Sequence, residues 1–116
     1  MIAKESVKRP WGRFLVIHDE PTYKLKRIEV EPGGRLSYQY HNKRSEAWTI
    51  VDGVGCITID GLEKDYLKGD TVLIPLGAKH RIENKGTKKL IFIEVQTGSY
   101  FGEDDIIRVE DDYNRI

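Results

Sequence analysis

The sequence predicts an all-β fold, a sandwich or a barrel of short strands. Apolar and polar residues alternate along most of the chain, which is the period of a strand with one buried face. Turn signals rich in Gly, Pro and Asp recur about every eight to twelve residues, a spacing typical of sandwiches and barrels. No stretch longer than about ten residues shows a helical period, so we expect little helix.

Clear turn signals separate the expected strands. The cluster Glu-Pro-Gly-Gly at 31–34 ends the first of them, and Asp-Gly at 52–53 ends another. Asp-Gly at 60–61 is a strong hairpin signal, and Pro75 stops a short apolar strand because proline cannot donate a ladder hydrogen bond. The expected strands are 24–30, 36–41, 47–51, 55–60, 71–74, 80–84 and 88–96, followed by 105–113 as a short strand or a single turn.

Size and charge exclude several classes of function. A chain of 116 residues corresponds to one domain, expected over residues 1–116. Nineteen basic residues balance nineteen acidic ones, so we expect neither nucleic acid nor a membrane surface as a partner. The single cysteine, Cys56, excludes an intrachain disulfide. No apolar run is long enough to span a bilayer, and residues 1–8 lack a signal-peptide core, so we expect a cytoplasmic protein.

Two of the three histidines fall in stretches bounded by glycine turns. Alternate residues of a strand share a face, so Ser37, Gln39 and His41 point the same way. Three inward polar groups in a row are costly to bury without a strong partner, which a metal ion supplies. Glu46 adds a carboxylate, and His80 comes from the second stretch. We therefore expect one divalent metal ion held by Gln39, His41, Glu46 and His80.

The expected donor set combines nitrogen and oxygen atoms, which suits Zn, Co, Mn, Ni or Fe. A single histidine or glutamine on a strand is more often an ordinary hydrogen-bonded residue, so the combination carries the prediction. His18 lies beside a turn and is expected to be exposed. Trp11 and Trp48 are expected in the core.

The same residues form two motifs that resemble those of the cupin superfamily. The first runs from Gly33 to Gly53 through His41 and Glu46, with Gln39 in place of its usual first histidine. The second consists of Gly69, Pro75, Gly77, His80 and Asn84. The resemblance implies a cupin double-stranded β-helix, which is a jelly-roll barrel.

Further segments resemble the type II phosphomannose isomerases, a narrower cupin family. They are 9–12 (RPWG), 26–28 (KRI), 36–39 (LSYQ), 74–77 (IPLG), 94–100 (EVQTGSY), 102–108 (GEDDIIR) and 112–113 (DY). The resemblance covers residues 9–115 and implies a metal-dependent isomerase that interconverts mannose 6-phosphate and fructose 6-phosphate. This activity would feed GDP-mannose and polysaccharide synthesis.

The chain departs from this family in two respects. In most relatives the domain follows a sugar-nucleotide pyrophosphorylase domain. The 116 residues contain no Gly-rich nucleotide loop, so we expect no guanylyl transfer from this chain alone. The family also tends to carry further histidines around the first motif, where this chain has Asn42, Lys43 and Ala47.

Basic and hydroxyl side chains near the motifs are candidates for contact with a sugar phosphate. Lys26 shares a face of the segment 24–30 with Ile28 and Val30, so it is expected to point into the barrel. The alternative is a solvated lysine on an edge strand. The resemblance implies a substrate-side role for Arg108, and the alternative is an ion pair with Asp105 or Glu110. We assign catalytic roles to Lys26 and Arg108, and substrate binding to Ser37, Arg13 and Arg44. The sequence does not identify the general base.

Two other functions stay open. A non-catalytic module that binds metal and sugar phosphate beside a separate pyrophosphorylase would explain the polar positions lost around the first motif. An iron oxygenase uses two histidines and one carboxylate, although Gln39 as a fourth ligand would fill a position that such a site needs open. By analogy with small cupins we also expect a homodimer, with 8–14 and 106–109 as candidate interface segments.

Overall fold

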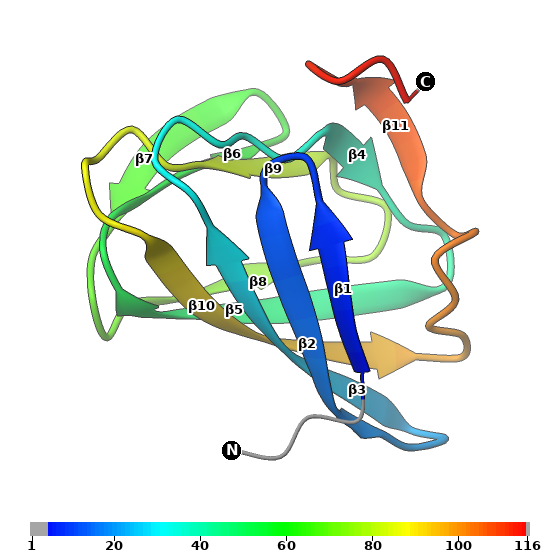
Figure 1. Ribbon diagram of the computed structural model, residues 1–116. Helices are drawn as coiled ribbons and strands as arrows, with labels where there is room; N and C mark the ends of the chain where they lie inside the picture. Colours follow the sequence, from blue (N-terminus) through cyan, green and yellow to red (C-terminus); the bar gives the residue numbers. More distant parts are fainter. Residues whose placement is uncertain (1–4, 116) are drawn as a thin grey trace.

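The computed structural model describes residues 5–115 as two antiparallel β-sheets that face each other (Figure 1). The strands are β1 (Glu5–Arg9), β2 (Gly12–Asp19), β3 (Tyr23–Val30), β4 (Tyr38–Tyr40), β5 (Arg44–Asp52), β6 (Gly55–Ile59), β7 (Leu62–Tyr66), β8 (Thr71–Ile74), β9 (His80–Glu83), β10 (Leu90–Gly98) and β11 (Ile107–Glu110). The six-stranded sheet has the order β1-β2-β3-β10-β5-β8, and the five-stranded sheet has the order β11-β4-β9-β6-β7. The predicted all-β fold is confirmed.

The predicted domain includes residues 1–4 and 116, which lie outside the described residues. The prediction that residues 1–8 lack a signal-peptide core falls partly on the same residues 1–4. Among the described residues, no helix has the length and apolar character needed to cross a membrane.

All seven predicted strands are present with small shifts at their ends, and 105–113 contains the short strand β11. The hairpin predicted at 60–61 joins β6 to β7, and the positive φ angles of Asp60 (47°) and Gly61 (83°) are those of its tight turn. The sequence does not predict β1, β2 and β7. Strand β7 is exposed almost throughout, so no alternation marks it, and β2 buries three consecutive residues, 14–16, which hides its period.

The inward face of β5 changes from charged to apolar along the strand. Its buried residues are Arg44, Glu46, Trp48 and Ile50, each two positions from the next. Trp48 and Ile50 belong to the apolar core between the sheets. Arg44 and Glu46 extend the same face beyond that core.

Strand β10 pairs with β5 and has the reverse order of polarity. Its buried residues Leu90, Phe92, Glu94 and Gln96 begin apolar and end polar. In the antiparallel register Gln96 lies opposite Glu46. The pairing therefore gathers the polar residues of both strands at one end of the interior.

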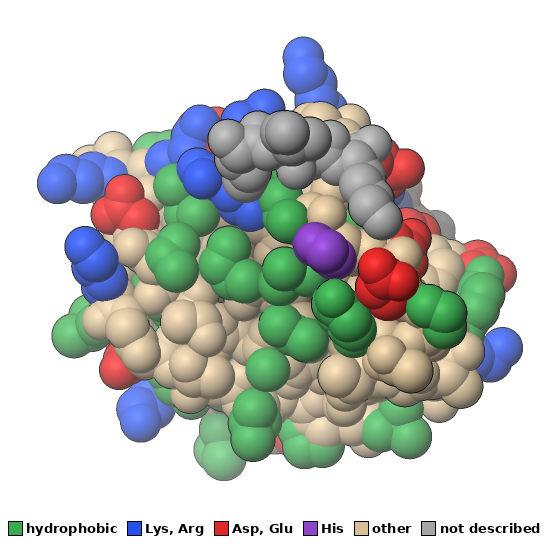
Figure 2. Space-filling model, turned by 90° about the horizontal axis from the view of Figure 1, so that it is seen from below, with side chains coloured by type: hydrophobic (Ala, Val, Ile, Leu, Met, Phe, Trp, Pro, Cys, Tyr) green, Lys and Arg blue, Asp and Glu red, His purple; other side chains and the backbone are tan. Residues whose placement is uncertain are grey.

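Some large apolar side chains lie on the surface. Leu73 on β8 is 72% exposed because it alternates with buried Val72 and Ile74. Figure 2 shows hydrophobic side chains spread over the face seen from below, among polar and charged ones.

The homodimer stays a prediction. The two candidate interface segments pair within the chain, since 8–14 forms the turn of the β1–β2 hairpin and 106–109 enters β11, which pairs with β4.

A buried carboxylate on β3 links neighbouring strands of the six-stranded sheet. Glu29 is 1% exposed. It accepts hydrogen bonds from Arg13 (2.9 and 3.1 Å), Arg27 (3.1 Å) and Lys89 (3.3 Å). The bonds from Arg13 lower the pKa of Glu29 more than burial raises it, and Lys89 lowers it further. Glu29 therefore stays ionised beneath three basic side chains.

We predict that Glu29→Gln makes folding less sensitive to acid. A carboxyl group whose pKa is lowered by folding contributes its full stabilisation at pH values above its ordinary pKa of 4.5. The contribution is lost as the pH falls through the lower pKa of the folded state. The melting temperature of the wild-type protein should therefore fall more steeply below pH 4.5 than that of the variant. Differential scanning calorimetry across the acid range measures both slopes.

Glu31→Gln is a matched control, because Glu31 is an exposed carboxylate that pairs with Lys89 at 3.4 Å. This variant should follow the wild-type slope. Parallel acid slopes for the wild-type protein and Glu29→Gln would contradict the prediction.

Candidate metal centre

Three buried side chains bring their donor atoms together at the polar end of the interior. The ligand atoms of His41, Glu46 and His80 all lie within 4.8 Å of one another. His41 follows β4 and His80 begins β9 in one sheet, whereas Glu46 comes from β5 in the other. The Nε2 atoms of His41 and His80 lie 3.2 and 3.7 Å from the two carboxylate oxygens of Glu46. The two sheets thus meet at one cluster of metal donors.

Backbone carbonyl groups fix the orientation of both imidazole rings. His41 Nδ1 lies 2.8 Å from the carbonyl oxygen of Asp105, and His80 Nδ1 lies 2.9 Å from that of Ala78. A carbonyl oxygen only accepts, so each Nδ1 donates its proton and the Nε2 lone pair of the neutral ring faces Glu46. Metal-binding histidines are commonly held in this way.

The donor set fits a cation. A lone pair on Nε2 and a carboxylate oxygen repel each other unless a positive charge lies between them, and burial lowers the pKa of His80, which favours its neutral form. Burial alone would raise the pKa of Glu46, but the hydrogen bonds that it accepts from Arg44 and Trp48 favour its ionised form. The cluster therefore offers two neutral nitrogens and one negative carboxylate, which suits a divalent ion.

Arg44 already places one positive charge at the cluster. Its Nε donates to Glu46 Oε2 at 2.9 Å, and its Nη2 lies 3.4 Å from His41 Nε2. A carboxylate has about four lone-pair sites, so Glu46 can accept from Arg44 and still offer oxygen lone pairs to a metal ion. Arg44 is 3% exposed and is part of this site rather than of the surface.

A second buried carboxyl group lies behind Glu46. Trp48 Nε1 donates to both Glu46 Oε1 and Glu94 Oε2, each at 3.0 Å. Gln96 Nε2 donates to Glu94 Oε1 at 2.7 Å. Burial, aided by the charge of Glu46, raises the pKa of Glu94 to about 8. Neither Glu94 nor Gln96 was predicted as a site residue, although alternation along 88–96 puts both on the same face as buried Phe92.

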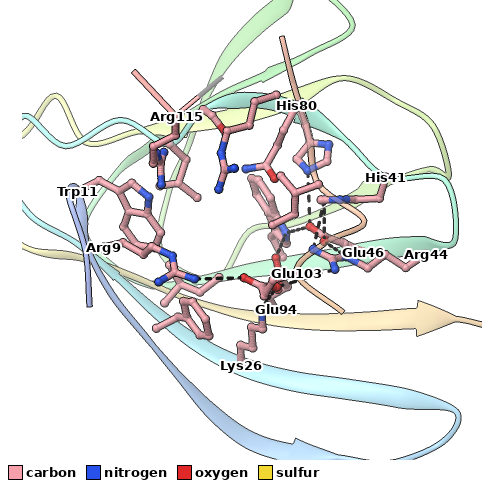
Figure 3. A pocket seen from close by; sticks show the side chains of 18 residues that line it. Arg9, Trp11, Lys26, His41, Arg44, Glu46, His80, Glu94, Glu103 and Arg115 are labelled. Atoms are coloured by element: carbon pink, nitrogen blue, oxygen red, sulfur yellow. Dashed lines mark hydrogen bonds and ion pairs between the residues drawn. The ribbon is translucent and has the colours of Figure 1, made fainter. Parts of the chain in front are cut away.

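The cluster opens into a cavity whose lining includes most of the predicted site residues. Figure 3 shows His41, Glu46 and Arg44 on one side of it and Arg9, Trp11 and Arg115 on the opposite side. The predicted residues in its lining are Lys26, Ser37, Gln39, His41, Arg44, Glu46, His80 and Arg108. Gln39 pairs with His80 in the β4–β9 ladder and with Arg108 in the β4–β11 ladder.

Arg13 is the predicted site residue that the structure places elsewhere. On β2 Phe14 points inward and lines the cavity, so its neighbour Arg13 points outward and binds Glu29. Arg9, on the adjacent strand β1, lines the cavity instead. Arg9 was not predicted as a site residue because the alternation does not mark β1, and Glu103 and Arg115 were not predicted because no strand pattern marks their segments.

The chain matches the family described as "Mannose-6-phosphate isomerase C-terminal" over residues 1–111. Among curated relatives, the mannose-1-phosphate guanylyltransferase of Klebsiella pneumoniae is 44% identical over 109 residues. This alignment covers 94% of the present chain but only 23% of that protein, so the chain spans less than a quarter of the relative's length.

Solved structures with low sequence identity share the fold. The capsular polysaccharide assembling protein CapF from Staphylococcus aureus superposes with a TM-score of 0.78 at 23% identity, over 92% of this chain and 34% of CapF. An RmlC-like cupin from Shewanella frigidimarina gives a TM-score of 0.73 at 19% identity, over 86% of each chain. These similarities confirm the predicted double-stranded β-helix of the cupins.

We predict that a divalent ion stabilises the wild-type protein but not His80→Ala. A ligand that binds only the folded state adds about 2.7 kcal/mol to the unfolding free energy at about 100 times its Kd. After chelation, the melting temperature should rise when single divalent ions are added to the wild-type protein, and calorimetric titration should give the Kd.

His18→Ala is the matched control for this measurement, because the His18 side chain is 52% exposed and lies outside the donor cluster. It should keep the wild-type response to metal. An equal rise in melting temperature for His80→Ala would place the metal elsewhere.

Proposed function

Because the chain belongs to the mannose-6-phosphate isomerase C-terminal family of cupins, we propose that it interconverts mannose 6-phosphate and fructose 6-phosphate with the help of a divalent metal ion. The observation that carries this proposal is the buried cluster of His41, Glu46 and His80, which opens into a cavity lined by basic side chains. We place the reaction in the cytoplasm, where it would feed GDP-mannose and polysaccharide synthesis, and we expect the homodimer that the cupin resemblance implies.

The reaction moves a proton between C1 and C2 of the sugar, and negative charge develops on the substrate oxygens. A metal ion held by His41, Glu46 and His80, with Gln39 as a fourth ligand, would supply a Lewis acid for those oxygens. Lys26 Nζ donates to Glu103 Oε2 at 3.1 Å and so faces the cavity as a cation. A fixed cation at this place stabilises the developing charge.

A buried hydroxyl group is available for the sugar. Ser37 is 1% exposed, lines the cavity and leaves its Oγ without a hydrogen-bond partner among the described residues. A buried hydroxyl group without a partner is costly, and a substrate hydroxyl would satisfy it. Ser37 therefore suits substrate binding.

The group that carries the proton has to be free of the metal. Glu94 lines the cavity, is not one of the three donors, and lies opposite Lys26 in the register of β10 and β3. Trp48 and Gln96 hold its carboxyl group in place. We assign the acid–base role to Glu94, while Lys26 keeps the role of charge stabilisation.

A non-catalytic binding module is the second candidate. Two observations favour it: the Klebsiella relative is named for guanylyl transfer, and the Arg44 guanidinium lies against Glu46, where it competes with a metal ion for the carboxylate. Such a module would bind metal and sugar phosphate without turnover. The iron oxygenase uses the same donor types, and oxygen uptake by the iron-loaded protein would identify it.

We predict metal-dependent turnover of mannose 6-phosphate that requires His41. The protein is stripped with a chelator, reloaded with single divalent ions and coupled to detection of fructose 6-phosphate. His41→Ala should lose at least about 100-fold in kcat/KM, because even partners that only orient a ligand contribute about 10- to 100-fold. His18→Ala should keep the wild-type rate. Metal binding without turnover by any ion would favour the binding module.

We predict that Glu94→Gln lowers kcat by roughly 10²- to 10⁴-fold, the usual contribution of a general acid–base group. KM and the metal-dependent rise in melting temperature should change little, because the amide keeps the size of the side chain. Glu63→Gln, on the exposed strand β7, is the control and should behave as wild type. A Glu94→Gln variant with wild-type kcat would assign the proton transfer to another group.

A further inference from the structure

One arginine in the cavity wall forms no ion pair within residues 5–115. Each of the other seven arginines forms an ion pair with a carboxylate among the described residues, and Arg108 forms none. Its Nε is buried and makes no hydrogen bond. The two carboxylates named as alternative partners bind elsewhere, since Asp105 accepts from the backbone of 42–43 and Glu110 accepts from Arg81.

Two further guanidinium groups line the same cavity. Arg115 is held by Asp111 at 2.8 Å, and Arg9 lies 3.7 Å from Glu103. Burial lowers the pKa of Arg108 and the like charges of Arg115 and Arg9 lower it further, whereas Asp111 and Glu103 oppose this shift. Arg108 is half-buried, and a guanidinium group in that setting without an ion-pair partner and beside two others is unfavourable, so this part of the cavity is suited to an anion.

The balance of charge among the side chains that line the cavity also favours an anionic ligand. Five basic side chains line it against three carboxyl groups, even before a metal ion is added. Glu46 and Glu94 lie at the donor cluster, and Glu103 is shared by Lys26 and Arg9. None of these three carboxyl groups forms an ion pair with Arg108 among the described residues.

Two of the three arginines lie apart from the metal donors, whereas Arg108 is opposite Gln39 in the β4–β11 ladder. Figure 3 shows Arg9 and Arg115 across the cavity from His41 and Glu46. Trp11 lies on the side of Arg9 and gives that part of the wall an aromatic surface. A ligand that fits this arrangement carries an anionic group at one end and neutral oxygens at the other.

We propose that Arg108, flanked by Arg9 and Arg115, forms a subsite for the phosphoryl group of the ligand. The planar fork of a guanidinium group matches two phosphoryl oxygens, which distinguishes it from the single charge of a lysine. The identification of the ligand as a sugar phosphate rests on the proposed function. Binding of the phosphoryl group itself requires neither metal nor turnover.

Calorimetric titration of the purified protein, before and after chelation, tests the subsite. The ligands are inorganic phosphate, mannose, mannose 6-phosphate and GDP-mannose. Mannose 6-phosphate should bind more tightly than mannose, and Arg108→Gln should raise its Kd by roughly 10- to 100-fold, as expected for loss of a charged hydrogen-bond pair. Arg108→Lys should lose less, because it keeps the charge without the fork.

Arg35→Gln is the matched control, because the Arg35 guanidinium pairs with Asp112 and does not line this cavity. It should leave the Kd of mannose 6-phosphate unchanged. Circular dichroism and melting temperature establish that each variant is folded. If Arg108→Gln does not fold, Arg9→Gln takes its place and should also weaken the binding of mannose 6-phosphate.

The outcomes separate the subsite from the isomerase. Binding that depends on Arg108 in a protein without turnover supports the subsite and overturns the proposed function. GDP-mannose binding more tightly than mannose 6-phosphate also supports a phosphoryl subsite, but it identifies a sugar nucleotide as the ligand. Wild-type binding of mannose 6-phosphate by folded Arg108→Gln, or binding no tighter than that of mannose, overturns the subsite.

Discussion

The antiparallel pairing of β5 with β10 is the constraint from which the site follows. Each strand has a polar half and an apolar half, in opposite order, so one register both completes the core and brings Glu46 beside Glu94. A shift by one residue would turn Trp48 and Phe92 out of the core and expose them. The packing of the apolar halves therefore sets the register of β5 and β10, and this register determines where the polar cluster forms.

The buried carboxylate of Glu46 determines the character of its surroundings. An unpaired ionised carboxylate in the interior would cost several kcal/mol, so Trp48 and Arg44 donate hydrogen bonds to Glu46, and the two histidines beside it offer lone pairs to a shared cation. The same negative charge makes ionisation of Glu94 unfavourable. Two neighbouring carboxyl groups thus differ in charge, which is a common property of functional sites.

Sequence reasoning identified the residues whose positions depend on local pattern. Glycine-bounded stretches and alternation indicated His41, Glu46 and His80, and all three meet in the structure. Arg13 was misplaced because three consecutive buried residues in β2 hide which face it occupies. Arg9 and Arg115 were missed because they reach the cavity through the packing of distant segments, and single-sequence periodicity carries no information on that packing.

The hydrogen bonds that complete the cavity wall join distant parts of the chain. Lys26 and Glu103 are 77 residues apart, and the imidazole of His41 is oriented by a carbonyl group 64 residues further on. Such long closures carry a large entropic cost before any contact offsets it, and folds built from them form slowly. During synthesis the wall therefore stays incomplete until nearly the whole domain has emerged from the ribosome, so ligand binding follows the last docking step rather than guiding the first.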